Sequence, residues 1–269
     1  MMKIRFWGVR GSIPTPGEKT ARFGGNTSCV EITTDDGTSL VFDAGTGIRE
    51  FGLDYLKRNN KSNVLNIFIS HVHWDHIQGF PYFVPAFLAD MEINIYSGQE
   101  IQKNMMSQMD APYFPVKMSD LNSSVNFHVI GSAGMEVGGA LVTPIKLVHP
   151  QEVYGFSVWH NNKMVVYSSD TEFEAGGDIN GYVEAVKGAD VLLFDAQYTP
   201  EEYSNGRVGW GHSTYEVAVE ISKKAGVKKL VLFHHEPTHD DATVESIEKK
   251  AKALFSDTVA AREGMTLEV

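Results

Sequence analysis

Residues 70–76 form a dense group of side chains that can bind metal ions. This short segment places three imidazoles and one carboxylate close together, at His71, His73, Asp75 and His76. Imidazole and carboxylate are ligands that zinc, manganese and iron accept in proteins. His71 and His73 alternate, so in an extended chain both side chains point to the same side. The two later side chains follow where a turn could aim them at a neighbouring point, so one segment could serve two metals.

Further chemistry-bearing side chains lie at comparable places along the chain. The apolar run 64–69, typical of a buried strand, leads into the metal-binding segment. Three other residues directly follow apolar runs and a fourth precedes a helical run; they are His149, Asp170, His234 and His212. Because parallel strands end at the same edge of a sheet, we expect these side chains to meet the segment there.

The pattern of apolar residues predicts many strands and a few helices. Strands are expected at 3–8, 28–34, 39–42, 66–70, 93–96, 126–130, 141–147, 154–160, 164–168, 191–194 and 229–233. Helices are expected at 48–57, 100–108, 181–187, 213–225 and 241–255. Early strands cluster and later strands alternate with helices, which predicts an α/β sandwich of two mixed sheets with helices outside. The polar, proline-interrupted stretch 109–124 indicates a long functional loop or flap.

Composition narrows the class of protein. The 269 residues are 42% hydrophobic and 21% charged, which is typical of a globular chain, and we expect residues 1–269 to form one domain. A net charge of -11 disfavours binding to nucleic acid or an anionic membrane, although bound cations could still attract a phosphate. No signal peptide or membrane-spanning run is visible. Cys29 is the only cysteine, which favours a reducing cytoplasmic location.

In these motifs the chain resembles the metallo-β-lactamase fold superfamily of metal-dependent hydrolases. The markers appear in the family's order, namely Asp43 in FDAGTG at 42–47, the H-x-H-x-D-H segment, His149, Asp170 and His234. The opening FWGVRGSIPTP at 6–16 and the stretch 209–214 are similar to the phosphodiesterase branch. That branch includes ribonuclease Z and class II cyclic-nucleotide phosphodiesterases. The resemblance implies a four-layer αββα sandwich.

The resemblance also implies a ligand set for two divalent metal ions. His71, His73 and His149 would hold the first ion, and Asp75, His76 and His234 the second, with Asp170 between them. Zinc is the expected metal, and manganese or iron would fit the same ligands. Such a pair lowers the pKa of a bound water towards about 7, which supplies a hydroxide. Asp75 could orient this hydroxide and take its proton.

His212 separates the branches of the family. In the phosphodiesterase branch this position is implied to protonate the leaving oxygen, a task that suits an imidazolium near neutral pH. Gly209 and Gly211 would let the backbone approach a substrate closely. The alternative is that His212 caps the following helix. The carboxylate that orients His212 stays open among Asp195, Asp170 and Glu236.

The remaining candidates have structural alternatives. Asp43 is expected to support the metal loop through hydrogen bonds to its backbone. His235 and His239 compete with His234 as a ligand, and His128 and His160 are expected to be structural. Trp74 is expected to pack as a wall of the site. The aromatic residues of 80–87 are expected to line the core or a pocket. Residues of the first loop either contact phosphate or only shape the loop; they are Arg10, Ser12, Asn26, Thr27 and Ser28.

Taken together, the sequence predicts a dinuclear metal phosphodiesterase acting on a small or cyclic-nucleotide phosphodiester, with His212 as general acid. The alternatives are a carboxylic ester hydrolase, such as a lactonase or thioesterase, and a tRNA 3′-processing endoribonuclease. A basic arm for tRNA is not visible, since the stretch 109–124 contains only Lys117. We therefore expect no stable nucleic-acid binding and no membrane partner, and the family suggests a homodimer.

Overall fold

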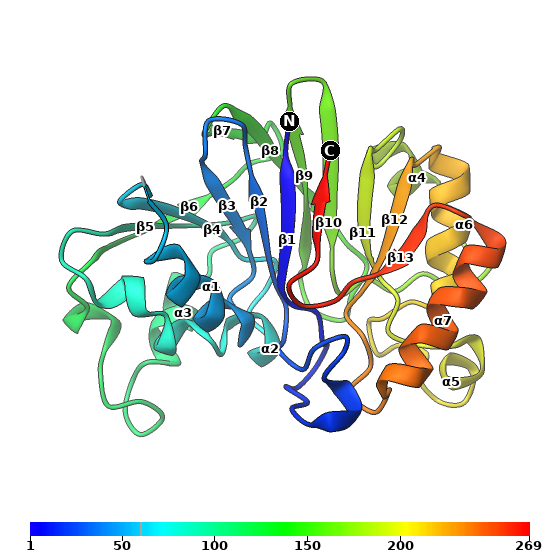
Figure 1. Ribbon diagram of the computed structural model, residues 1–269, viewed down its shortest axis with the longest axis horizontal. Helices are drawn as coiled ribbons and strands as arrows, with labels where there is room; N and C mark the ends of the chain where they lie inside the picture. Colours follow the sequence, from blue (N-terminus) through cyan, green and yellow to red (C-terminus); the bar gives the residue numbers. More distant parts are fainter. Residues whose placement is uncertain (60) are drawn as a thin grey trace.

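Two seven-stranded sheets form the centre of the structure, a computed structural model that describes residues 1–59 and 61–269. The first sheet has the order β14 (Thr266–Glu268), β1 (Lys3–Gly8), β2 (Cys29–Thr33), β3 (Ser39–Phe42), β4 (Val64–Phe68), β5 (Glu92–Ser97) and β6 (Ser124–Val129). The second has the order β13 (Thr258–Ala260), β12 (Lys229–Phe233), β11 (Val191–Asp195), β10 (Lys163–Ser168), β9 (Tyr154–His160), β8 (Ala140–Lys146) and β7 (Met135–Val137). The two sheets face each other in Figure 1.

Both sheets are mixed in the same way. In the first, β3 to β6 pair in parallel and β14 to β3 pair antiparallel. In the second, β10 to β13 pair in parallel and β10 to β7 pair antiparallel. The parallel strands need crossover connections, which carry the helices to the outer faces. The prediction of two mixed sheets with outer helices is confirmed.

Seven α-helices surround the two sheets within the described residues, and the longer ones cover the outer faces. They are α1 (Gly47–Tyr55), α2 (Trp74–Ile77), α3 (Gln102–Ser107), α4 (Asn180–Ala185), α5 (Pro200–Ser204), α6 (Tyr215–Ala225) and α7 (Asp241–Leu254). In Figure 1, α1 and α3 lie beside the first sheet, while α6 and α7 lie beside the second. Phe51 of α1 packs with Ile67 outside the first sheet, and Ile221 of α6 packs with Leu230 outside the second. The result is a four-layer αββα arrangement.

Aromatic side chains fill the space between the two sheets. Phe42 and Phe68 of the first sheet stack with ring centroids 5.1 Å apart. Phe156 of the second sheet approaches both rings at 5.7 Å, and Tyr167 lies 5.6 Å from Phe42. All four side chains are buried. Because both faces of each sheet are covered, the strands read as continuous apolar runs.

The expected strands and helices are all present, with ends that shift by a few residues. Three short strands, β7, β13 and β14, were not expected from the sequence. A strand of three residues carries too little alternation to stand out from a loop. The last of them pairs with β1 and brings the C-terminus beside the N-terminus, at the top of Figure 1.

The stretch 109–124 contains one short 3-10 helix, Met118–Asp120, and otherwise runs as a loop until β6 begins at Ser124. Met109 and Met118 are buried in the outer core of the first sheet. The Ser123 hydroxyl donates to the Ala86 carbonyl at 2.7 Å. The loop is therefore attached at several points. Within the described ranges, no helix has the length and apolar character that crossing a membrane requires.

Replacing Phe156 tests the core between the sheets. Phe156→Ala removes a ring that contacts both stacked aromatics of the opposite sheet. We expect the free energy of unfolding to fall by about 3–5 kcal/mol, measured by denaturant titration. Trp159→Ala is the matched control, because Trp159 lies on the same strand with its side chain 45% exposed. Equal losses for the two variants would contradict this account of the core.

Candidate metal centre

Loops from both sheets bring the predicted metal-binding side chains to one place. The first two histidines follow β4, the next two residues lie in α2, and the others follow β8, β10 and β12; these residues are His71, His73, Asp75, His76, His149, Asp170 and His234. Their ligand atoms form two groups, in each of which all lie within 4.8 Å of one another, and Asp170 belongs to both. The groups lie at the lower edge of the sheets in Figure 1, where α2 is drawn.

Each oxygen of Asp170 faces one of these groups. Its Oδ2 lies 3.6 Å from His71 Nε2 and 3.9 Å from His149 Nε2. Its Oδ1 lies 3.0 Å from His76 Nε2 and 3.2 Å from His234 Nε2. Asp75 joins the second group, with Oδ2 3.1 Å from His234 Nε2. One carboxylate therefore stands between two sets of nitrogen atoms.

The two groups fit divalent metal ions. The Nε2 atoms of His71, His76 and His149 are buried, and within the described residues they have no hydrogen-bond partner. His76 Nε2 lies 3.2 Å from Asp75 Oδ2 and 3.0 Å from Asp170 Oδ1 without a hydrogen bond to either. Leaving a buried polar atom unpaired costs about 1–3 kcal/mol. Buried imidazole and carboxylate in this arrangement are the donor set that zinc and related ions accept.

Asp43 holds the metal-binding loop from behind. Its Oδ1 accepts a hydrogen bond from the Ser70 backbone N–H at 2.8 Å. Its Oδ2 lies 2.7 Å from His76 Nδ1 and accepts the Tyr167 hydroxyl at 2.7 Å. A carboxylate on Nδ1 fixes the tautomer of His76 that leaves Nε2 free for a metal. Because Tyr167 comes from β10, the same carboxylate also links the two sheets.

Strained backbone conformations occur where strands end at the site. Asp43, Asp170 and His234 have φ angles of 61°, 56° and 62°, each just past the end of its strand. Ser12 in the first loop has a φ of 62°. A left-handed residue other than glycine costs about 1–3 kcal/mol and persists only where its surroundings fix it. The strain turns these side chains back towards the cluster instead of continuing the strand.

His212 forms an ion pair with Asp195 beside the cluster. His212 Nδ1 lies 2.7 Å from Asp195 Oδ2, and the imidazole stacks on His234 with centroids 5.0 Å apart. Burial lowers the pKa of His212, but Asp195 outweighs it and raises the pKa to about 9. Asp195 is thus the partner that the sequence left open. Helix α6 is capped by Thr214, whose side chain accepts from Val217 N, so His212 does not cap it.

His212 and Asp195 also lie near Asp170 and His234, a set that could be taken for a third metal group. The oxygens of Asp195 are already engaged, however. Oδ2 accepts from His212 and from the Thr171 N–H at 3.2 Å, while Oδ1 accepts from the Gln197 N–H at 3.1 Å. We therefore interpret this pair as a hydrogen-bonded dyad facing the two metal groups.

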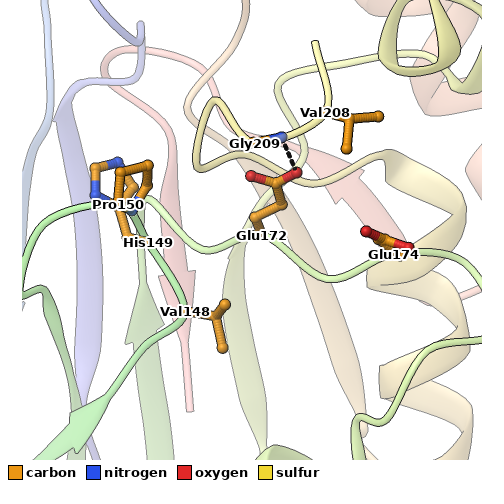
Figure 2. A pocket seen from close by; sticks show the side chains of 7 residues that line it. All are labelled: Val148, His149, Pro150, Glu172, Glu174, Val208 and Gly209. Carbon is orange, nitrogen blue, oxygen red and sulfur yellow. Dashed lines mark hydrogen bonds between the residues drawn. The ribbon is translucent and has the colours of Figure 1, made fainter.

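Glu172 organises the loop that carries His212. Its carboxylate accepts the backbone N–H groups of Gly209 and Gly211 at 2.6 and 2.7 Å and the Tyr203 hydroxyl at 2.7 Å. Figure 2 shows Glu172 at a pocket of about 320 Å³ that His149 also lines. A Cβ on Gly211 would come within 2.2 Å of the His149 ring. Gly211 therefore lies directly against His149, a residue of the first candidate group.

The first loop shapes the site from the other side. The Ser12 backbone N–H donates to Asp75 Oδ2 at 2.7 Å. Arg10 is fully buried and donates to the backbone carbonyls of Gly24, Glu236 and His239. Arg10 therefore fixes the loop and does not face a phosphate, which decides between the two roles left open for it.

The other histidines lie outside the cluster. His235 is buried, its Nε2 contacts the Ala261 carbonyl at 2.8 Å, and burial lowers its pKa to about 3. His239 pairs with Glu202, His128 with Asn94, and His160 with Asp35. Of the three neighbouring histidines 234, 235 and 239, only His234 belongs to a metal group within the described part of the chain.

Three supporting residues were missed by sequence reasoning. They are Glu172, Tyr167 and Gln197, whose amide lies 3.1 Å from His234 Nδ1. Tyr167 and Gln197 lie close to predicted strand ends, where a search for polar side chains could have found them. Glu172 lies two residues after Asp170, but its partners are two backbone N–H groups and the distant Tyr203 hydroxyl, which leave no pattern in a sequence.

The comparison with known proteins identifies the family. A family model described as the beta-lactamase superfamily domain matches residues 38–235, and the chain belongs to this family. Ribonuclease Z of Archaeoglobus fulgidus is 24% identical in an alignment covering 100% of this chain and 98% of that protein. Two solved structures share the fold. YhfI, a metallo-β-lactamase fold protein from Bacillus subtilis, has a TM-score of 0.76 at 20% identity, covering 100% and 99% of the two chains. Human tRNase Z, short form, has a TM-score of 0.71 at 18% identity, covering 99% of each.

These findings confirm the predicted family, fold and enzyme class, a metal-dependent hydrolase. They overturn the prediction about partners. Relatives matching the whole chain are named ribonuclease Z, so the expectation of a small substrate without nucleic-acid binding is wrong. The error came from net charge, which averages over the entire surface, whereas a substrate phosphate meets the local field of a metal site.

Removing the carboxylate between the two groups tests the metal centre. Asp170→Ala takes one oxygen from each group, and we expect the purified protein to lose most of its bound metal, measured by elemental analysis after gel filtration. Asp190→Ala is the matched control, because Asp190 is buried at a salt bridge with Lys163 outside the cluster. Full metal content in the Asp170 variant would refute its place between two ions.

Replacing Glu172 tests the loop that carries His212. Glu172→Gln keeps the shape but loses the charge that binds two N–H groups, so we expect amide hydrogen exchange at Gly209 and Gly211 to rise about tenfold or more. Glu174→Gln is the control, since Glu174 lines the same pocket with an exposed side chain. Unchanged exchange in the Glu172 variant would show that this carboxylate does not hold the loop.

Proposed function

We propose that the protein is a dinuclear metal-dependent phosphodiesterase that cleaves a phosphodiester bond in RNA. The observation that carries the proposal is the His212–Asp195 pair, stacked against a cluster with the donor set for two ions. Hydrolysis of a phosphodiester expels an alkoxide, which needs a proton as it leaves. The names of the relatives that match the entire chain support RNA as the substrate class.

The metal ions would be held by the residues of the two groups. His71, His73 and His149 would hold one ion, Asp75, His76 and His234 the other, and Asp170 would contact both. Bound divalent ions supply a hydroxide at neutral pH and neutralise phosphate charge. The histidine-rich donor set favours zinc, while manganese and iron would also be accepted.

The chain's own residues divide the remaining work. Asp75, fixed by the Ser12 N–H, is placed to orient the attacking oxygen and accept its proton. Asp195 occupies Nδ1 of His212, so the proton that the ring can donate is on Nε2. The raised pKa keeps His212 protonated at neutral pH, and nearby cations would lower that pKa towards the range suited to a general acid.

The RNA substrate class is compatible with the acidic chain. Metal ions bring positive charge to the point where the phosphate binds, so a basic surface is not a requirement for cleavage. The alignment with the Archaeoglobus fulgidus enzyme extends over 323 positions, more than the 269 residues of this chain, so the relative carries insertions. We infer that this chain contacts a shorter part of its RNA substrate than that relative does.

Two further expectations complete the proposal. Residues 1–269 form one domain, supported by a core shared between the sheets and by the pairing of β1 with β14. The location is the cytoplasm, supported by Cys29, which is a free buried thiol.

Replacing the proposed general acid tests the reaction. In His212→Ala we expect metal content to persist and kcat for RNA to fall by about 10²-fold or more, because the ribose alkoxide loses its proton donor. We expect kcat for bis(p-nitrophenyl) phosphate to fall much less, because p-nitrophenolate leaves as a stable anion without protonation. His128→Ala is the matched control, because His128 lies in β6 and pairs with Asn94 of β5, outside the metal groups. Unchanged turnover of RNA in the His212 variant would remove it from the reaction. Metal-loaded wild type that cleaves lactones or thioesters but neither phosphodiester would overturn the proposed function.

A further inference from the structure

A groove of about 250 Å³ is lined in part by the segment that carries His71, His73 and Asp75. Its lining is uncharged and consists of Val72, Trp74, Ile77, Asn104, Ser107, Gln108 and Tyr113. Trp74 lies in the chain between His73 and Asp75, so its Cα is only about 3.8 Å from those of two residues of the metal groups. The groove and the candidate metal centre therefore share the segment 71–77, whose residues line one or the other.

Trp74 departs from the expectation that it packs as a wall. Its side chain is 68% exposed, although it opens α2 among buried residues. Tyr113, from the loop after α3, is 73% exposed in the same groove. Aromatic side chains lose a large favourable burial energy when they remain in water. Two exposed aromatics at one groove beside an active centre mark a surface that a ligand covers.

The polar side chains of the groove narrow the class of ligand. Asn104 and Gln108 carry amides with both donors and acceptors, and the Ser107 hydroxyl, which donates to the Lys103 carbonyl, adds an acceptor oxygen. Amides can pair with the edges of a flat heterocycle, while tryptophan and tyrosine stack on its face. The absence of charge from the lining residues named above disfavours a second phosphate there.

We propose that this groove, the Trp74 groove, binds a nucleobase next to the scissile phosphodiester, stacked on Trp74; the inference rests on the proposed RNA cleavage. Every phosphodiester in RNA is flanked by nucleosides. A phosphate that reaches the metal centre brings a neighbouring base within reach of the adjoining groove. Stacking accepts any base, so the groove adds affinity with little sequence preference.

The test pairs variants of the groove with RNA that lacks a base. Trp74→Ala, Trp74→Phe and Tyr113→Ala are compared with wild type on one oligonucleotide, and on copies with an abasic nucleotide on either side of the cleaved bond. We expect Trp74→Ala to raise KM about tenfold or more, Tyr113→Ala to raise it less, and Trp74→Phe to restore most of the affinity. Trp159→Ala, an exposed tryptophan on β9, is the matched control.

The abasic substrates decide whether the base is what Trp74 binds. On the copy that lacks the stacked base, Trp74→Ala should cost nothing further. An equal rise in KM for Trp74→Ala on every substrate would contradict base binding in the groove. An unchanged KM for both groove variants with metal content preserved would contradict it as well. Failure of wild type to cleave any RNA would overturn the proposed function instead. In that case the Kd values of the uncleaved oligonucleotides, measured for the same variants with and without the base, test whether the groove binds a base.

Discussion

The buried carboxylate of Asp170, set among four imidazoles, is the interaction on which the rest of the site depends. Its two oxygens face different pairs of histidines, at 3.6 and 3.9 Å on one side and 3.0 and 3.2 Å on the other. Several of these nitrogens are buried without a hydrogen-bond partner in the described chain. A cluster of this kind is costly alone and would become favourable with bound cations, so metal binding would contribute to folding as well as to chemistry.

The arrangement of the two sheets brings the ends of several strands close to that carboxylate. Left-handed residues at the ends of β3, β10 and β12 turn Asp43, Asp170 and His234 out of their strands. The Tyr167–Asp43 hydrogen bond then ties one sheet to the other directly behind the cluster. On one flank Glu172 holds the loop of His212, and on the other the first loop reaches Asp75. The packing between the sheets, the left-handed residues at the strand ends and the geometry of the candidate metal centre therefore depend on one another.

Much of this could be predicted from the sequence, because strand ends and metal ligands leave local patterns. Apolar runs located the long strands, and the residues at their ends gave the positions that meet in space. Contacts between distant segments were not predictable in this way: Asp195 was one of three open partners for His212, and Glu172 binds only backbone atoms there and a tyrosine. The exposure of Trp74 depends on what surrounds α2. Net charge led to the wrong prediction of the substrate, because it is one value for the whole chain and does not say where the charges lie.

The most direct test of the central claim is to titrate metal-free protein with zinc or manganese and to measure RNA cleavage against the number of ions bound per chain. The account predicts that two ions bind, that cleavage appears as the second ion is bound, and that thermal stability rises with occupancy. Full cleavage with one ion bound, or two bound ions without cleavage of any phosphodiester, would contradict it.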